Sequence, residues 1–171
     1  MSSEQDIIST VNIASISINS DGSTMVAGGA DTKIRIYTYN SVTSQYTNTA
    51  NITGFTGNID KIKITPDSFI IIAGTTNGVY IWKNNQGTYV LVQTITDGTG
   101  NVMDIDISAD VSYTYLVVGW SDNNVRLYIN SGWYFNLQQT IPDATGINVV
   151  ELNNRGNILA IGSNDNHLRT Y

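Results

Sequence analysis

The chain contains no cysteine, one histidine and two prolines, and only 13% of its 171 residues are charged. Without cysteine there is no disulfide, thiolate nucleophile or Cys-based zinc site. The single histidine, His167, excludes any site that needs two histidines from one chain, and we interpret it as a surface or packing residue. Phosphate-binding glycine loops and metal-binding motifs are also missing. We therefore expect no catalytic residue, metal or cofactor, and predict that the chain is not an enzyme.

Basic residues are scarce as well, with 8 Lys and Arg against 14 Asp and Glu and a net charge of −6. They are scattered and form no cluster of the kind that binds phosphates, so we expect neither nucleic acid nor an anionic membrane as a partner. No apolar run approaches the ~20 residues of a membrane-spanning helix. The first twelve residues lack the cationic and apolar pattern of a signal peptide, and the expected location is therefore cytoplasmic.

What the chain does contain is a repeat. Four stretches share an apolar run, a turn rich in Gly, Asn and Asp, and an alternating run that closes on an aromatic residue. The closing aromatics are Tyr37, Trp82, Tyr128 and Tyr171, which are separated by 45, 46 and 43 residues. A period of about 40–45 residues built only of strands is typical of a β-propeller blade.

Each repeat divides into four short strands, and alternation predicts the innermost strand of each at 13–18, 59–64, 102–107 and 147–152. The predicted fold class is all-β, a β-propeller of four-stranded antiparallel blades with four blades in the chain. We expect a single repeat domain over residues 1–171, with blades at 13–52, 59–95, 102–141 and 147–171. The pair Gly28-Gly29 is interpreted as the start of the turn after the second strand.

The last repeat provides only three strands, whereas segment 3–7 has the spacing of a fourth strand with no strands before it. Ile7 precedes Ile18 by 11 residues, as Ile141 precedes Leu152. An unpaired strand and an open blade edge are both unfavourable, so we expect segment 3–7 to complete the last blade of a partner chain or of the same chain.

These repeats resemble the WD40 family over essentially the whole chain. The resemblance rests on the Asp21-Gly22 turn and on the third strands at 34–37 and 79–82, which end on an aromatic residue. The Gly-His and Trp-Asp pairs of the family are absent, so its Asp–His–Ser/Thr–Trp hydrogen-bond network cannot form. The resemblance implies a propeller fold but not a function, since propellers serve as scaffolds, lectins and enzymes alike.

Paired carboxylates are the first candidate site. Asp104 and Asp106 lie two apart on a predicted innermost strand and so share one face, where they could bind a cation or act as acid and base. Lys61 and Lys63 occupy the matching positions of the preceding repeat. We favour a ladder of Lys–Asp pairs between the two blades beside the channel.

Loop aromatics are the second candidate. Trp120 and Trp133 match no large aromatic in the other repeats, and Asp122 and Asn123 follow Trp120 closely. Such a surface could stack on a sugar ring or anchor a peptide, and the alternative is that the rings fill space between blades. The predicted function is thus an interaction scaffold or a self-assembling module. The alternative is a lectin-like propeller that binds glycans.

Ring size follows from the wedge between blades. With strands about 4.8 Å apart, the gap between neighbouring flat blades widens by roughly 20 Å from inner to outer strand in a four-bladed ring, and by roughly 11 Å in an eight-bladed one. The rim connections are too short to fill the wider gap. We therefore expect an eight-bladed ring made by a homodimer, joined by strand exchange.

Overall fold

The computed structural model describes residues 5–108, 114–142 and 146–171, and within these ranges all regular structure is β-strand. None of the described segments is a helix that could span a membrane. The strands are β1 (Ile13–Ile18), β2 (Thr24–Gly29), β3 (Ile34–Asn40), β4 (Gln45–Ile52), β5 (Ile59–Ile64), β6 (Ile70–Thr75), β7 (Gly78–Asn85), β8 (Thr88–Ile95), β9 (Val102–Ile107), β10 (Tyr115–Trp120), β11 (Asn124–Ser131), β12 (Tyr134–Pro142), β13 (Ile147–Leu152), β14 (Leu159–Ser163) and β15 (Leu168–Thr170).

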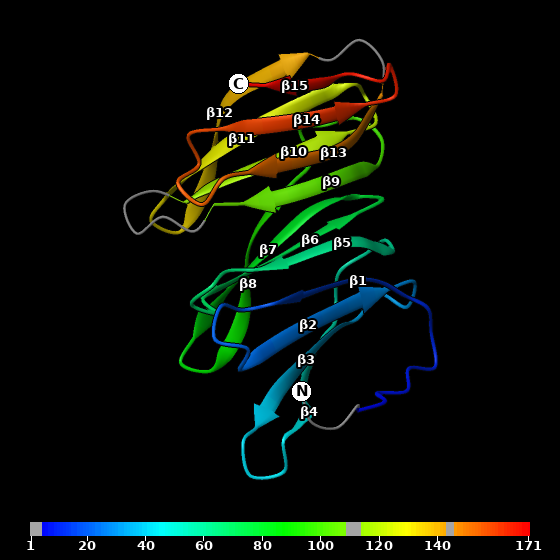
Figure 1. The fold of residues 1–171 in the computed structure, drawn as a ribbon, viewed down its shortest axis with the longest axis vertical. Helices are drawn as coiled ribbons and strands as arrows, with labels where there is room; N and C mark the ends of the chain where they lie inside the picture. Colours follow the sequence, from blue (N-terminus) through cyan, green and yellow to red (C-terminus); the bar gives the residue numbers. More distant parts are fainter. Residues whose placement is uncertain (1–4, 109–113, 143–145) are drawn as a thin grey trace.

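The strands form four antiparallel sheets in chain order, which we call blades 1 to 4. Blades 1 to 3 hold β1–β4, β5–β8 and β9–β12, and blade 4 holds β13–β15 in the part of the chain that the structure describes. Figure 1 shows blade 1 at one end of the long axis and blade 4 at the other, so the four blades form an open arc. The predicted all-β architecture of four blades per chain is confirmed, and it is consistent with half of a propeller.

The core lies between the blades rather than within them. Three buried apolar clusters join blade 1 to 2, 2 to 3 and 3 to 4, and each takes side chains from two successive sheets. At each joint the innermost strand contacts the innermost strand of the next blade, as in β1 with β5, β5 with β9 and β9 with β13. Each blade therefore has one face toward the preceding blade and one toward the following blade.

Gly28 and Gly29 lie in strand β2, and their assignment to the turn was wrong. The reason is the close approach of the next blade. A Cβ atom on Gly28 would lie 2.6 Å from Cγ2 of Ile59, so a side chain there would collide with β5. A glycine that ends an apolar run can serve either a turn or a close contact, and here it serves the contact.

Residues 5–12 run beside blade 1 without forming a strand. The fourth strand predicted at 3–7 therefore falls partly on residues outside the described ranges, and its described part is not in a sheet of this single chain.

Candidate functional site

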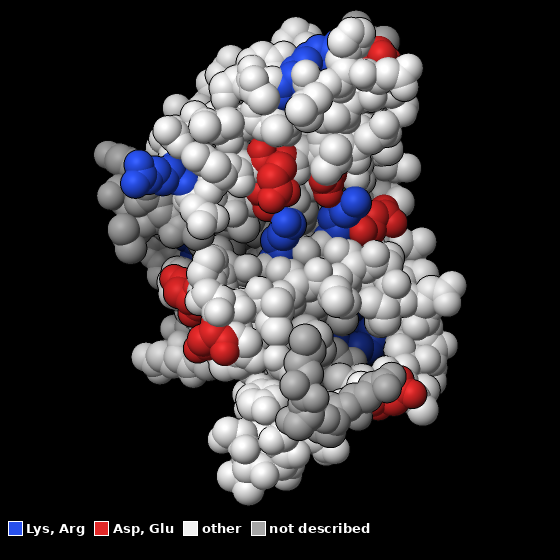
Figure 2. Space-filling model, viewed as in Figure 1, with Lys and Arg blue, Asp and Glu red and all other residues white. Residues whose placement is uncertain are grey.

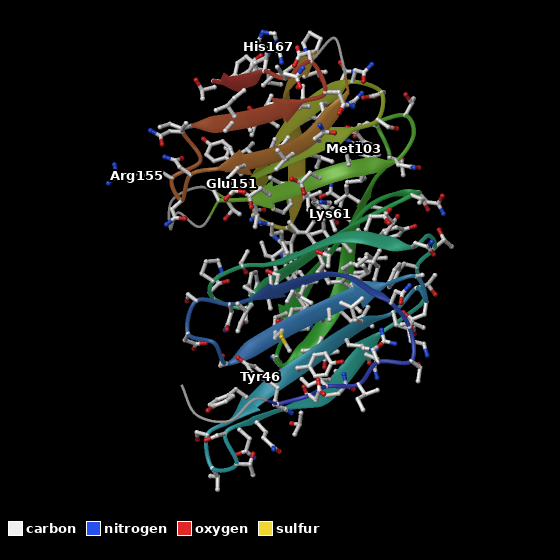
Figure 3. The ribbon with its side chains drawn as sticks, turned by 45° about the vertical axis from the view of Figure 1, so that its right-hand side comes forward. Tyr46, Lys61, Met103, Glu151, Arg155 and His167 are labelled. Atoms are coloured by element: carbon white, nitrogen blue, oxygen red, sulfur yellow. The ribbon has the colours of Figure 1, made fainter. Side chains whose placement is uncertain are left out.

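The predicted Lys–Asp pairs lie at the joint between blades 2 and 3, where β5 meets β9. Lys61 Nζ lies 3.3 Å from Asp104 Oδ1, and Lys63 Nζ lies 2.8 Å from Asp106 Oδ1. Figure 2 shows basic and acidic side chains meeting where blades 2 and 3 join, and Figure 3 shows Lys61 between these two sheets. Burial alone would lower the pKa of Lys63, but the hydrogen bond and charge of Asp106 outweigh it and the pKa is raised.

The same carboxylates also hold blade 4. Asp104 Oδ2 accepts a hydrogen bond from the backbone N–H of Val150 at 3.0 Å, and Asp106 Oδ2 accepts one from Leu152 at 2.7 Å. Each carboxylate thus contacts a lysine of blade 2 with one oxygen and a backbone N–H of β13 with the other. Within the described ranges, no group of three or more acidic or histidine side chains could hold a metal ion. The arrangement fits a structural ladder that joins three successive blades.

Serines make the equivalent contact at the joint of blades 1 and 2. Ser15 Oγ accepts from the N–H of Ile62 at 3.0 Å, and Ser17 Oγ accepts from that of Ile64 at 3.1 Å. The third and fifth residues of an innermost strand therefore accept from the fourth and sixth N–H groups of the next one. This rule holds at the joint of blades 1 and 2 and at the joint of blades 3 and 4. At the joint of blades 2 and 3 the third residue is Lys61, which forms an ion pair with Asp104 instead.

Trp120 lies at the end of β10, where it is 1% exposed. Its ring packs against Gly98, where a Cβ would lie 2.0 Å from the indole, and the guanidinium carbon of Arg126 is 5.9 Å from the ring centre. The structure thus places Trp120 in the packing between blades 2 and 3, where no glycan could stack on it without rearrangement.

Trp133 is the opposite case, since it is 56% exposed on the hairpin between β11 and β12. One side of its ring covers Lys83, whose Nζ lies 5.7 Å from the ring centre. Lys83 Nζ donates to Asn130 Oδ1 at 3.3 Å and to the Gly132 carbonyl at 2.5 Å. Burial lowers the pKa of Lys83. Trp133 therefore caps a buried ammonium and still presents an aromatic surface.

Asp122 closes the turn between β10 and β11. Its two oxygens accept from Arg126 at 2.8 and 3.2 Å, and one also accepts from the N–H of Asn124. Burial raises the pKa of Asp122, but hydrogen bonds from Arg126 and from the N–H groups of Thr99 and Asn124 outweigh it and lower the pKa to about 2. Asn123 occupies the left-handed position of the turn, with φ of 62°. Both residues act in the turn.

The Asp122–Arg126 pair belongs to a pattern that sequence reasoning missed. The same spacing of four joins Asp31 to Arg35, with 2.5 Å between their charged atoms, and Asp165 to Arg169. The signal was visible as Asp-x-x-x-Arg in three of the four repeats.

His167 precedes β15 with its side chain largely exposed, and its Nδ1 lies 3.2 Å from Asp165 Oδ2. The structure thus places this single histidine at the surface.

Blade 1 exposes apolar residues of β1 whose counterparts in β5 are buried. The face of blade 1 that would meet a preceding blade carries Ile13, Ile16 and Ile18, which we call the first end face. Ile16 is 64% exposed, whereas its counterpart Ile62 in β5 is 1% exposed because blade 1 covers it.

Blade 4 is open on its opposite side. The face that would meet a following blade carries Val149, Glu151, Gly162 and Leu168, which we call the last end face. Leu168 is 74% exposed, whereas the first residue of β3, Ile34, is fully buried at the joint with blade 2. The two end faces are thus the two halves of a joint between blades.

Comparison with known families supports this geometry. The family model of the WD domain, G-beta repeat, matches residues 7–38, which span the approach to blade 1, strands β1 and β2, and most of β3. No curated protein sequence matches the chain. WD40 domains commonly bind protein partners and are generally non-enzymatic scaffolds. Four successive antiparallel blades, with a match to the WD40 repeat over the first, fit a WD40-like β-propeller.

Proposed function

We propose that this chain is a non-enzymatic protein-interaction scaffold that assembles itself. Two copies, each one repeat domain over residues 1–171, close an eight-bladed ring as a homodimer. One observation carries the proposal, namely that both end faces expose what every joint within the chain buries. The last end face of each copy meets the first end face of the other, and a two-fold axis relates the two joints.

The end faces also complement each other in shape and polarity. The first end face offers apolar knobs, Ile13 and Ile16, and the last offers a small residue, Gly162, beside the apolar Val149. Burial of exposed apolar surface is the main favourable term in most protein association. A closed ring would cover this surface on both copies, and an open arc would leave it in water.

The mass in solution tests the assembly. Light scattering is expected to give twice the chain mass of 18.6 kDa at micromolar concentration. Ile16→Lys should give a folded monomer, because a lysine costs little at an exposed position but leaves an unpaired charge in the closed joint. Val42→Lys is the control, since Val42 is also an exposed apolar residue, at 92% against 64% for Ile16, but lies on the hairpin between β3 and β4, and it should stay dimeric.

A wild-type chain that is folded and monomeric at that concentration would contradict the proposal. An Ile16→Lys variant that remains dimeric would place the contact elsewhere on the surface.

Glycan binding is the second candidate, and the exposed ring of Trp133 is the observation in its favour. It requires saturable binding on a glycan array that Trp133→Ala abolishes. Trp120→Ala does not test it, because Trp120 is buried.

A further inference from the structure

The segment before blade 1 is held to that blade by a two-bond clamp. The Gln5 amide donates from Nε2 to the Tyr46 carbonyl at 2.7 Å, and Gln5 Oε1 accepts from the Tyr46 N–H at 2.7 Å. A side-chain amide that pairs with both groups of one backbone residue imitates a neighbouring strand. Gln5 thus satisfies one residue of β4, the outer strand of blade 1.

The same clamp is found between blades 2 and 3. Gln93 Nε2 donates to the Phe135 carbonyl at 2.8 Å, and Gln93 Oε1 accepts from the Phe135 N–H at 2.7 Å. Gln93 belongs to β8, the outer strand of blade 2, and Phe135 belongs to β12, the outer strand of blade 3. Here the clamp joins the outer strands of successive blades.

The sequence positions of the two clamps agree. Gln5 precedes Ile7 by two residues, as Gln93 precedes Ile95, the last residue of β8. Tyr46 lies six residues before the end of β4 at Ile52. Phe135 likewise lies six residues before Ile141 in β12. Gln5 therefore contacts the outer strand of blade 1 in the same way as a residue from the outer strand of a preceding blade would.

Blade 4 is the blade that lacks an outer strand in the described chain. Its third strand, β15, lies at the opposite end of the molecule from β4 (Figure 1), which carries Tyr46, the residue that Gln5 contacts. In this open arc the segment cannot reach the β15 of its own chain. In the ring of two copies, however, blade 4 of one copy stands next to blade 1 of the other.

We propose that residues 5–7 of each copy add to β15 of the other as the antiparallel outer strand of its blade 4. This inference rests on the proposed ring. The register follows from the complete blades, in which Ile34 pairs with Ile52, Val79 with Ile95 and Val125 with Ile141. By the same pairing Leu168 stands opposite the partner's Ile7. That contact would cover two apolar side chains that are exposed in the single chain.

The rest of the joint then repeats the internal joints. Ile13 of the other copy packs against Gly162 as Ile59 packs against Gly28 within the chain. A Cβ on Gly28 would lie 2.6 Å from that isoleucine. Glu151 holds the same strand position as Asp106, which accepts from the backbone of the following blade. It therefore accepts from the N–H of the partner's Ile18.

Disulfide trapping in the full chain tests the register, because the native sequence has no cysteine to interfere. Directly opposed residues on neighbouring antiparallel strands have Cα atoms about 4.5–5.5 Å apart, which lies within the range that a disulfide spans. The double variant Ile7→Cys and Leu168→Cys, mildly oxidised, should run as a covalent dimer on a non-reducing gel. The control pair Val42→Cys and Leu168→Cys should stay largely uncrosslinked, since position 42 lies on a remote hairpin.

The outcomes separate this inference from the ring itself. A wild-type dimer whose Ile7→Cys and Leu168→Cys variant fails to crosslink would overturn strand addition and leave the ring intact. A disulfide within one chain, visible as a faster-migrating monomer, would overturn the second copy as the occupant. A wild-type monomer would remove the proposed function on which the inference rests.

Discussion

At the scale of single residues, one carboxylate can connect three successive blades. Asp106 binds Lys63 of the preceding blade with one oxygen and the Leu152 N–H of the following blade with the other. Lys63 is partly open to water, so its charge contributes modestly. The hydrogen bond to the buried N–H group matters more for stability, because an unsatisfied donor in the core costs about 1–3 kcal/mol.

A double-mutant cycle separates these two roles. Asp106→Asn keeps an oxygen for the Leu152 N–H but removes the charge, and Lys63→Met removes the ammonium and keeps most of the apolar stem. We expect a coupling free energy of roughly 0.5–1 kcal/mol in urea unfolding, and a smaller one at high salt. Additive effects of the two substitutions would show that the pair contributes nothing. Asp106→Ala should cost more than Asp106→Asn because it also leaves the Leu152 N–H unpaired.

Some residue roles could be predicted and others could not, for a physical reason. Alternation along a strand determines which side chains share a face, so the meeting of Lys61 with Asp104 could be inferred from matching positions. The backbone N–H that a carboxylate accepts from depends on how far adjacent blades are offset, which spacing does not reveal. Trp120 is a candidate surface residue in the sequence because it matches no large aromatic in the other repeats, whereas in the structure it lies buried in β10.

At the scale of elements, the innermost strands were the most predictable. Their bounds at 13–18, 59–64, 102–107 and 147–152 are those that the alternation predicted. The second strand of blade 1 extends further than expected because Gly28 and Gly29 remain in the sheet. Gly28, Gly74 and Gly119 each accommodate the first residue of the next innermost strand, and a Cβ on any of them would lie 2.6–2.7 Å from that residue.

Gly162 is the glycine in this position of blade 4, and its substitution separates effects on assembly from effects on folding. Gly74→Ala should lower the free energy of unfolding by about 1–3 kcal/mol in any assembly state, since the new methyl group collides with Val102 inside the chain. A Cβ on Gly162 meets only Val149, which is half exposed and can turn away. Gly162→Ala should therefore leave the monomer folded and weaken the dimer.

Urea unfolding of the two variants, with light scattering over a dilution series, makes this comparison. Equal loss of stability in both monomers would contradict the assignment of Gly162 to a joint between copies.

At the scale of the whole molecule, the repeat period determined the architecture but not the closure. Four blades of this size occur both in a small closed ring and in half of a large one, and the choice depends on the angle between blades. That angle follows from side-chain packing at each joint, in which large residues such as Trp120 and Phe55 take part. In the structure blades 1 and 4 stand at opposite ends of the arc (Figure 1), an arrangement that the sequence pattern alone could not establish.

If two copies close the ring, stability depends on concentration. Unfolding of a dimer into two chains is opposed by mass action, so a hundredfold rise in protein concentration adds about 2.7 kcal/mol per dimer. With an unfolding entropy of about 2.1 cal/mol/K per residue, the thermal midpoint of the wild type should rise by roughly 4 °C over that range. Ile16→Lys, which opens both joints, should unfold at a lower temperature that does not change with concentration. Calorimetry at two concentrations, with reversibility checked by a second scan, measures both effects, and a wild-type midpoint independent of concentration would show that the arc is stable without a second copy.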